Sequence, residues 1–438
     1  MAKSSIDVAS DAWGRVFRNH PDIMQTIRER GYCEVKADTI KEEREPRLMT
    51  KHDFLDGVPS PLKSHHVNVL SVTRHSYVLG EFDVFQKFPE EKPSRLEFCT
   101  LPPFETLRVD DITSESKAIN ALIISGVLNR FLGTDELTET FNGRMGTGRF
   151  DFSIGLRKRN PLWLTVNGAQ LEIDGGFEND ECVVIMEAKN RLHDDFNVRQ
   201  LYYPLKKYST FVTKPIRLVF SQYDNLTYTL YEYEFADIDD FNSIQLVGAA
   251  SYAFEDCRVT ADDVMRVWET TEVIYDDSEH QIEGEPPFPQ ADKIERIFSL
   301  LEFLRDQPEQ SATTVEIAEF MGTVVRQAAY YPAAGVYLGV LKRSRNNITL
   351  SREGVALLKK NRRERLLDVA RLMFRHEVFH RLYDEISHQY GEIPNTEVIA
   401  ETLYALNVLG DSTNSMYVRR AQTVRAWLKW LFDLPDED

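Results

Sequence analysis

Residues 171–189 read Leu-Glu-Ile-Asp-Gly-Gly-Phe-Glu-Asn-Asp-Glu-Cys-Val-Val-Ile-Met-Glu-Ala-Lys. This segment gives the most specific indication of the fold. Its segment 182–186 is a short apolar run with β-branched residues, which favours a buried strand. The preceding segment 171–177 alternates enough to be its antiparallel partner, and the polar residues 178–181 suit a turn. The stretch therefore predicts a β-hairpin.

The expected register of this hairpin gathers chemically useful side chains. If the turn centres on its polar residues, Asp174 lies roughly opposite Ile185, and Glu187 roughly opposite Glu172. Because side chains alternate along a strand, Asp174, Glu187 and Lys189 are expected on one side of the sheet. Asp174 and Glu187 are then diagonal neighbours with backbones about 7–8 Å apart. That separation lets both carboxylates reach one hard cation.

Two carboxylates and an amine in this arrangement predict metal-assisted hydrolysis. Neighbouring carboxylates repel unless a positive charge neutralises them. Mg²⁺ suits this role, because it binds through one or two carboxylates, keeps waters and accepts phosphate oxygens. A bound metal acidifies a water and offsets charge on phosphoryl oxygens. Lys189 is expected to orient or deprotonate the attacking water, or to stabilise charge in the transition state.

Asp174 followed by Glu187-Ala188-Lys189 on a hairpin resembles the active site of the PD-(D/E)XK nuclease superfamily. The family's proline is absent, because Ile173 precedes the aspartate. The resemblance implies that Asp174, Glu187 and the backbone carbonyl of Ala188 bind Mg²⁺ and that Lys189 prepares the water. The alternative is an ordinary edge hairpin with polar residues on its wet face, since Glu-x-Lys occurs by chance in most proteins. Asp151 is a rival for the upstream aspartate.

The order of elements around the hairpin matches what the superfamily core implies. A helix is expected at 114–132, two strand pieces within 140–154, a helix at about 196–212, and strands at 216–221 and 227–235. We therefore expect an α/β nuclease core: a restriction-endonuclease-like mixed sheet flanked by helices.

Two further residues are possible auxiliary members of the site. Glu115 begins the first helix, where some family members supply another carboxylate on the metal side. Gln200 lies on the helix after Lys189, where many members place Gln or Glu before a tyrosine. Glu115 also has a structural explanation, because an acid in the first turn interacts favourably with the helix dipole.

The composition predicts a multi-domain globular chain. At 438 residues it is too long for one core, so two or three domains are expected. No run approaches the ~20 apolar residues of a membrane helix, and the N-terminus lacks a signal-peptide apolar stretch. Cys33, Cys99, Cys182 and Cys257 show no paired spacing, which predicts free thiols in a reducing cytoplasm, bacterial or archaeal by the resemblance.

The net charge of −18 is unevenly distributed. Residues 231–290 hold 2 basic and 16 acidic residues, whereas residues 342–375 hold 11 basic and 3 acidic ones. A negative protein repels DNA overall, but a local basic face can still bind it. We therefore expect an affinity that is unusually sensitive to salt and Mg²⁺.

Five segments are expected along the chain. Residues 1–105 form an N-terminal β-rich region for DNA recognition or scaffolding, in which a helix at 11–30 is predicted and Arg74 and Tyr77 could touch DNA. The nuclease core spans 106–275, and the acidic, Pro-rich stretch 276–290 reads as a linker. Residues 291–360 form a winged-helix DNA-binding domain, and 361–438 a helical connector and a second winged-helix-like module.

The prediction of a winged-helix domain at 291–360 rests on short helices followed by a β-wing. Helices at 291–305, 313–320 and 325–341 precede a strand at 347–350, an order that resembles a winged helix-turn-helix. In that family the third helix enters the major groove and the wing touches the backbone. The expected DNA contacts are Arg326, Gln327, Lys342, Arg343, Arg345 and Arg352, and in the second module Asn414, Arg419 and Arg420. Such modules also serve as dimer contacts.

A competing motif is His376-Glu377-Val378-Phe379-His380, which matches H-E-x-x-H. On one helix the two histidines would lie one turn apart and could bind zinc, with Glu377 as base. His388 or Glu397 would be the third ligand. The charged residue Arg381 departs from the longer peptidase consensus, and the segment 361–390 reads as one connecting helix.

The sequence therefore predicts a Mg²⁺-dependent, sequence-specific double-stranded DNA endonuclease resembling type II restriction enzymes. The family implies 5′-phosphate and 3′-hydroxyl ends, a homodimer on a palindromic site and a companion DNA methyltransferase. One alternative is another nuclease of the superfamily, in repair or modification-dependent defence. The other is a zinc metallopeptidase using His376, Glu377 and His380.

Overall fold

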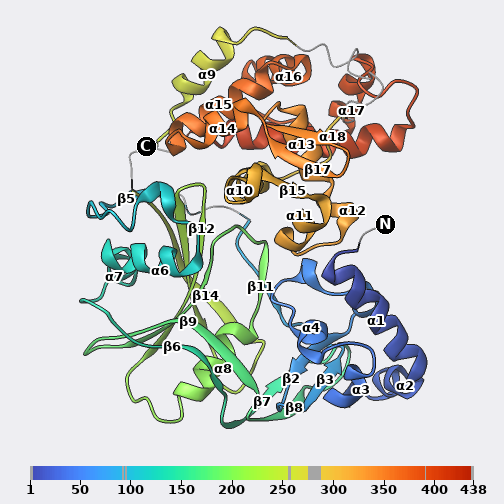
Figure 1. Cartoon of the computed structure of the whole chain (residues 1–438), viewed down its shortest axis with the longest axis vertical. Coiled ribbons are helices and arrows are strands. Elements are labelled where there is room, and N and C mark those ends of the chain that lie inside the picture. The colour runs from blue at the N-terminus through green and yellow to red at the C-terminus, as the bar shows by residue number, and fades with distance from the viewer. Residues whose placement is uncertain are drawn as a thin grey trace.

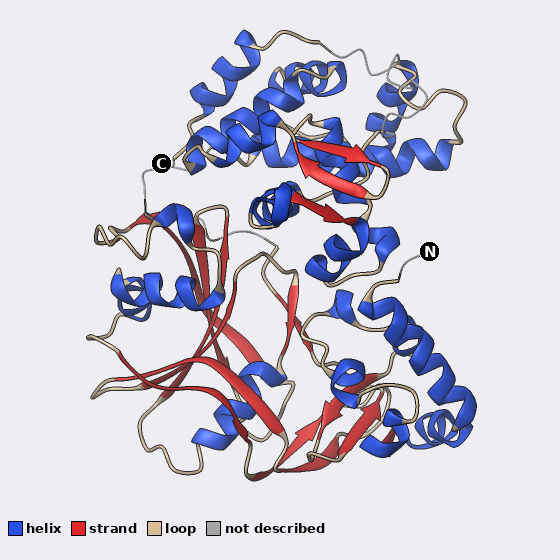
Figure 2. Ribbon diagram, in the orientation of Figure 1, coloured by secondary structure: helices blue, strands red, loops and turns tan. Residues whose placement is uncertain are grey.

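The computed structural model describes residues 3–90, 93, 96–254, 258–274, 288–389 and 391–435. The chain folds into three parts, and in the view of Figure 1 the C-terminal part lies above the other two. An N-terminal part and a helical C-terminal part each adjoin a central part built on a large sheet (Figure 2). A mixed α/β fold with a central mixed sheet, flanking helices and a helical C-terminal region is thus confirmed.

The N-terminal part is mainly helical, so the prediction of a β-rich region is wrong. Its small sheet has the order β1-β3-β2. The elements are α1 (Ser5–Asn19), α2 (Pro21–Arg30), β1 (Tyr32–Lys36), α3 (Ala37–Lys41), α4 (Pro46–Thr50), α5 (Ser60–Ser64), β2 (Asn68–Ser71) and β3 (Ser76–Gly80). Proline in the first turn starts α2, α4 and α5, where its missing N–H costs nothing. The helix expected at 11–30 is split at His20, just before Pro21.

The central part is a seven-stranded mixed sheet with the order β5-β14-β13-β12-β10-β9-β6. The β10–β12 and β14–β5 pairs are parallel and the others antiparallel. Its strands are β5 (Leu96–Phe98), β6 (Thr138–Gly146), β9 (Gln170–Glu178), β10 (Val183–Lys189), β12 (Ile216–Asp224), β13 (Thr227–Phe235) and β14 (Ile244–Ala253).

Helices cover both faces of this sheet. α6 (Glu115–Ile124) and α7 (Val127–Leu132) pack on the face that carries Val184, Met186 and Ala188. α8 (Arg199–Tyr208) packs on the face that carries Ile185. Gly126 has a φ of +70° and divides the helix expected at 114–132 into two. This three-layer arrangement leaves the C-terminal end of β10 near the sheet's rim.

The border between the N-terminal and central parts differs from the expected residue 105. β4 (Phe85–Lys87) pairs with β11 (Asp195–Asn197), and β5 adds to the large sheet beside β14. β7 (Arg149–Ile154) and β8 (Leu162–Asn167) form a separate two-stranded sheet. The chain therefore enters the central part before residue 90, because these strands find their partners there.

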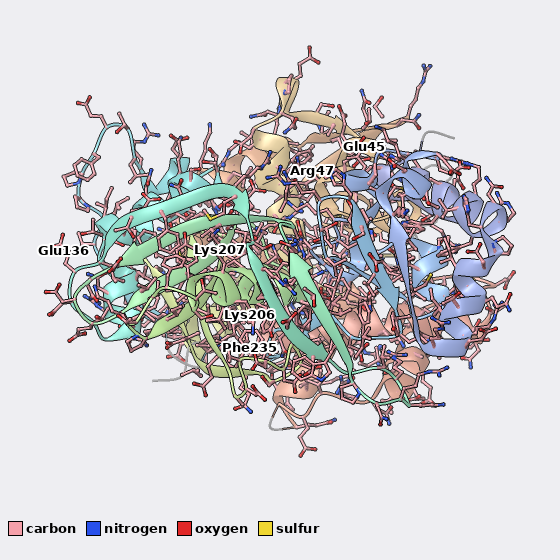
Figure 3. The ribbon with its side chains drawn as sticks, turned by 90° about the horizontal axis from the view of Figure 1, so that it is seen from below. Glu45, Arg47, Glu136, Lys206, Lys207 and Phe235 are labelled. Carbon is pink, nitrogen blue, oxygen red and sulfur yellow. The ribbon has the colours of Figure 1, made fainter. Side chains whose placement is uncertain are left out.

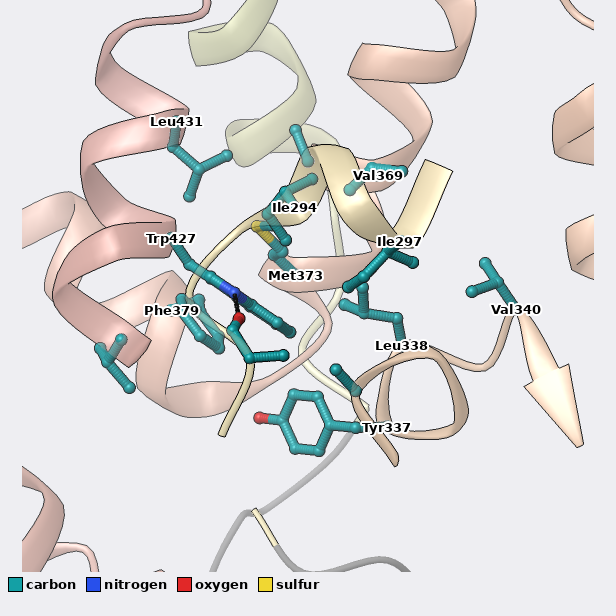
Figure 4. Close-up of a cluster of buried hydrophobic side chains, with 14 of the residues drawn as sticks. Ile294, Ile297, Tyr337, Leu338, Val340, Val369, Met373, Phe379, Trp427 and Leu431 are labelled. Atoms are coloured by element: carbon teal, nitrogen blue, oxygen red, sulfur yellow. Dashed lines mark hydrogen bonds between the residues drawn. The ribbon is translucent and has the colours of Figure 1, made fainter. Parts of the chain in front are cut away.

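The C-terminal part packs around a buried tryptophan. Trp427 is fully buried beside Phe379, and its indole N–H donates to the Ala291 carbonyl at 2.7 Å (Figure 4). The elements are α9 (Ala261–Thr270), α10 (Ile294–Arg305), β15 (Ser311–Thr313), α11 (Thr314–Met321), α12 (Val325–Ala328), α13 (Tyr330–Tyr337), β16 (Leu341–Ser344), β17 (Asn347–Leu350), α14 (Arg352–Leu358), α15 (Arg362–Phe374), α16 (Glu377–Ser387), α17 (Thr396–Ala405) and α18 (Asn414–Phe432). The strands form a sheet of order β15-β17-β16.

Two predictions for the C-terminal part are corrected. The helix expected at 325–341 is divided into α12 and α13 and is followed by β16. Within 361–389 and 391–435 there is no strand, so a second wing is absent from that described segment. Its apolar residues instead follow helical spacing on α18, where Val424, Trp427, Leu428 and Leu431 are buried.

Several predictions fall on residues outside the described ranges. Most of the linker expected at 276–290 lies there, as does Cys257, although Phe288 is described and packs on Tyr337. Cys33, Cys99 and Cys182 are free thiols. None of the described helices has the length and hydropathy needed to cross a bilayer.

Candidate active site

The hairpin at 171–189 forms, but its register differs from the expected one by two residues. β9 pairs antiparallel with β10, and Ile185 lies opposite Gly176 instead of Asp174. The turn sits one residue later than expected, at 179–182, where Asn179 N–H donates to the Cys182 carbonyl at 3.1 Å. An offset of two residues leaves each side chain on its expected face, because side chains repeat every two residues.

A β-bulge in β9 directs Asp174. Between the pairs Phe141↔Gly176 and Gly143↔Ile173, β6 advances two residues while β9 advances three. The extra residue falls at Asp174 and Gly175, and a bulge of this kind re-aims a side chain. Asp174 Oδ2 accepts a hydrogen bond from the Ala188 N–H at 3.0 Å.

The two glycines after Asp174 are required by close packing. A Cβ on Gly175 would lie 2.7 Å from the Phe177 ring, and one on Gly176 would lie 2.2 Å from the Phe141 ring. The Asp-Gly-Gly sequence therefore combines the bulge with a tight contact between strands.

The structure brings Asp174, Glu187 and Lys189 into contact. The Lys189 ammonium donates to Glu187 Oε1 at 2.7 Å and to the Ala188 carbonyl at 2.8 Å. It lies 3.5 Å from Asp174 Oδ2. The three side chains are recessed, with exposed fractions of 12% for Lys189, 18% for Asp174 and 8% for Glu187.

The two auxiliary residues also reach this cluster. Gln200 on α8 donates from its amide to Glu187 Oε1. Glu115, at the start of α6, has its Oε1 3.5 Å from the Lys189 ammonium. Glu115 also occupies the first turn behind the Ser114 cap, so its structural explanation holds as well. Asp151 lies apart, on β7, where it accepts from the Thr165 hydroxyl.

Burial governs the electrostatics of the cluster. It raises the pKa of Glu187 to about 8, although the adjacent Lys189 ammonium acts in the opposite direction. For Lys189 burial lowers the pKa, but the carboxylates of Glu187, Asp174 and Glu115 outweigh it and raise that pKa overall. In the metal-free cluster Lys189 is therefore a cation and a hydrogen-bond donor.

The oxygen atoms around Lys189 are chemically suited to a hard cation. The ammonium contacts the three groups expected to bind Mg²⁺, so a positive charge is already stabilised at this position. Three buried oxygens of residues that line the surrounding cleft have no hydrogen-bond partner within the described chain: Asp53 Oδ1, Asn190 Oδ1 and Gln200 Oε1. Among the described residues no group of three His, Cys, Asp or Glu side chains is gathered to hold a metal. Mg²⁺ at this site would thus depend on two carboxylates, a carbonyl and waters, which is a usual set.

The cluster lies in a cleft of about 810 Å³ whose walls come from all three parts of the protein. The N-terminal part contributes Arg47, Arg74 and Tyr77, among others. The central part contributes the cluster itself, and the C-terminal part contributes residues of α10 and α11 such as Phe303 and Phe320. Figure 3 shows Arg47 at the inner border of the N-terminal part.

Arg74 and Tyr77, named above as residues that could touch DNA, line this cleft, whereas none of the nine DNA contacts expected in the C-terminal part does. Eight are exposed: Arg326, Gln327, Lys342, Arg343, Arg345, Arg352, Asn414 and Arg419. Arg420 is half-buried, and its guanidinium donates to the Gln290 side chain. The basic side chains of the β16–β17 hairpin therefore form a surface separate from the cleft.

The H-E-x-x-H segment does not lie on one helix, so the expected connector 361–390 is wrong. α15 ends at Phe374 and α16 begins at Glu377, with His376 in an extended conformation as the cap. His376 is buried and stacks on Tyr337 with ring centroids 3.8 Å apart. His380 packs against Trp268, with ring centroids 5.1 Å apart. The two imidazoles thus have separate aromatic neighbours, and the described residues gather no third ligand beside them.

Several cleft residues carry no signal in the sequence. Arg47, Asp53, Arg191 and Arg199 come from separate elements and meet only through tertiary packing. Arg191 and Arg199 follow Lys189 closely, but neither has a distinctive motif.

Three family models match successive segments of the chain, and each is described as a domain of unknown function. They are DUF6996 over residues 10–79, DUF6997 over residues 80–253 and DUF7226 over residues 296–436. The cleft is therefore built from all three matched segments. No curated protein and no solved structure matches the chain.

Proposed function

We propose that this protein is a Mg²⁺-dependent nuclease that hydrolyses phosphodiester bonds in the cleft. The observation that carries the proposal is the convergence of Asp174, Glu187 and Lys189 at the end of the β9–β10 hairpin, around a position that already holds a cation. The order of helices and strands around the hairpin supports a restriction-endonuclease-like core.

Each residue has a distinct role in this proposal. Asp174, Glu187 and the Ala188 carbonyl would hold Mg²⁺, which when bound neutralises phosphoryl charge and acidifies a water. Gln200 fixes Glu187 through its amide. The Lys189 ammonium donates hydrogen bonds, so it orients the water and stabilises charge that develops on the phosphoryl oxygens.

The finer proposal is a sequence-specific DNA endonuclease of the restriction type that leaves 5′-phosphate and 3′-hydroxyl ends. Cutting both strands of a palindromic site then requires a homodimer, and a companion methyltransferase would protect host DNA. The elements α10, β15, α11–α13, β16 and β17 have the order of a winged helix and support a role in DNA binding. A nuclease acting in repair or on modified DNA is the second candidate, and resistance of modified DNA separates the two.

The test is incubation of the full chain with phage DNA, with Mg²⁺ and with chelator. We expect fragments only with Mg²⁺, and discrete fragments if cleavage is sequence-specific. Asp174→Ala, Glu187→Ala and Lys189→Ala should each abolish cleavage. The matched control is Glu178→Ala on the same strand, outside the cleft, whose carboxylate forms an exposed pair with Lys214. Cleavage that persists in all three cluster variants would refute the proposal.

A further inference from the structure

Four arginines of the cleft form no ion pair in the part of the chain that the structure describes, although the nearby charges of Glu115 and Asp53 act on Arg191. Arg47, Arg74, Arg191 and Arg199 all line it, and none forms an ion pair within the described chain. The protein has 70 acidic and 52 basic residues, so acidic partners are abundant. Unpaired guanidinium groups gathered in one concave site attract and concentrate anions. Phosphate is their preferred partner, because it matches the planar fork of donors.

Aromatic rings accompany these arginines. Phe54, Tyr77, Phe303 and Phe320 line the same cleft, and each is only partly buried. Phe303 and Phe320 stack with centroids 4.2 Å apart, and the Arg191 guanidinium lies 5.1 Å from the Phe320 ring centroid. Cationic groups interleaved with aromatic faces are typical of sites for single-stranded nucleic acid, where phosphates meet the cations and bases stack on the rings.

The size of the cleft points to the same class of ligand. Its volume of about 810 Å³ falls in the range of about 300–1,000 Å³ found for small-molecule sites. The cluster carboxylates are also recessed, with at most 18% of each side chain of Asp174 and Glu187 exposed. A few unpaired nucleotides fit such a space. A duplex is much broader, because its major groove alone is about 12 Å wide.

The N-terminal and C-terminal parts contact each other beside this space. Arg296 on α10 pairs with Asp56 of the N-terminal part at 3.2 Å and with Asp194 after β10 at 3.0 Å. Ser5 at the start of α1 donates to Glu319 on α11. These contacts join the two parts that contribute different sets of cleft residues, although the contacting residues do not themselves line the cleft.

We infer that the cleft binds an unpaired stretch of nucleic acid, with Arg47, Arg74, Arg191 and Arg199 on its phosphates and the aromatic rings on its bases. The inference rests on the proposed function, because the strand held there passes the metal-binding cluster. It names the substrate at the site as single-stranded, so a duplex must present a frayed, flapped or extruded strand to be cut. The inference therefore rests on the proposed nuclease activity and is an alternative to the finer proposal of cleavage at an intact palindromic site.

The test measures binding in the presence of chelator, so that no strand is cut. Fluorescence anisotropy compares a labelled DNA oligonucleotide, the RNA of the same sequence, and the blunt DNA duplex. We expect either single strand to bind at least about tenfold more tightly than the duplex. For four phosphate contacts, the logarithm of affinity should fall against the logarithm of salt concentration with a slope of about −3.

Two variants separate phosphate binding from a structural role. Arg74→Ala and Arg199→Ala should each weaken single-strand binding roughly tenfold and reduce the salt slope by about 0.7. Arg18→Ala is the matched control, because Arg18 is an exposed arginine of the N-terminal part outside the cleft. Duplex binding as tight as single-strand binding would overturn the inference, as would an unchanged salt slope in both cleft variants.

The outcome is distinguishable from a failure of the proposed function. Single-strand binding that depends on the arginines, without cleavage under any divalent metal, would refute the nuclease and leave the binding site. Cleavage that requires Asp174 and proceeds on blunt duplex more readily than on single strands would support the nuclease and refute the unpaired substrate.

Discussion

Replacing Arg365 with methionine should destabilise the protein strongly. Arg365 is only 1% exposed, and its guanidinium donates four hydrogen bonds. It pairs with Glu302 at 2.9 Å and donates to the carbonyls of Leu358 at 2.8 Å and Lys360 at 2.9 Å. It also reaches Asn225, in the turn between β12 and β13, at 3.3 Å. One side chain thus joins α10, α14 and α15 to the central sheet.

The expected magnitude follows from these partners. Breaking a buried ion pair by removing one member costs about 3–5 kcal/mol. Glu302 keeps 21% of its side chain exposed, so water can still hydrate its carboxylate after Arg365 is removed. The cost of breaking this ion pair therefore lies at the lower end of that range. Two carbonyls lose their donor and add about 1 kcal/mol or more each if they stay dry. We expect Arg365→Met to lower the free energy of unfolding by about 5 kcal/mol.

Arg363 on the same helix is the matched control. It pairs with Asp263 at 2.6 Å, but its side chain is 41% exposed. A pair of this kind contributes about 0–1 kcal/mol. Urea unfolding followed by tryptophan fluorescence and by circular dichroism should show this contrast, with coincident transitions as the test of two-state behaviour. An Arg365→Met variant that loses no more stability than Arg363→Ala would refute the reasoning.

Three other predictions follow from buried groups. Burial lowers the pKa of His52 from 6.5 to about 4, so as pH falls through this window the unfolded chain binds a proton that the folded chain excludes. His52→Gln should therefore remove up to about 3 kcal/mol of the destabilisation that acid causes, measured by urea unfolding at pH 7 and pH 4.5. Gly354→Ala should cost about 1–3 kcal/mol or more, because a Cβ there would lie 2.2 Å from the Val340 carbonyl oxygen, whereas Gly248→Ala meets open space and should be nearly neutral in thermal denaturation. His376→Ala should lower the melting temperature and leave zinc binding, measured by calorimetry, unchanged; stoichiometric zinc that this substitution abolishes would contradict the packing role.

The hairpin could be predicted because its signal is local. An apolar β-branched run, a polar turn and an alternating partner specify two strands without reference to the rest of the chain. The register could not be read off as reliably, since the turn occupies 179–182 and a bulge at Asp174 adds a residue to one strand. The faces nevertheless agreed with expectation, because an even offset preserves them.

Helix borders and the cleft show why other predictions failed. The helices expected at 114–132 and 361–390 are interrupted at Gly126 and at Arg375–His376, where the apolar spacing alone gives no warning. Several of the predicted DNA contacts are basic residues clustered at the expected β-wing of the C-terminal region. The arginines of the cleft that form no ion pair are instead scattered over distant elements. Their meeting depends on how three parts of the chain pack, and single-sequence periodicity carries no information on that packing.

Because three different family models match the segments that build the cleft, its chemical groups and its walls belong to different segments. The carboxylates and lysine proposed to act in hydrolysis belong to the middle segment, while Arg47 and Arg74 belong to the first and Phe303 and Phe320 to the last. Recombination near residues 80 and 296 would present the same chemistry with different walls. Exchange of a whole segment would thus change the walls of the cleft without a substitution in the strands that carry Asp174, Glu187 and Lys189.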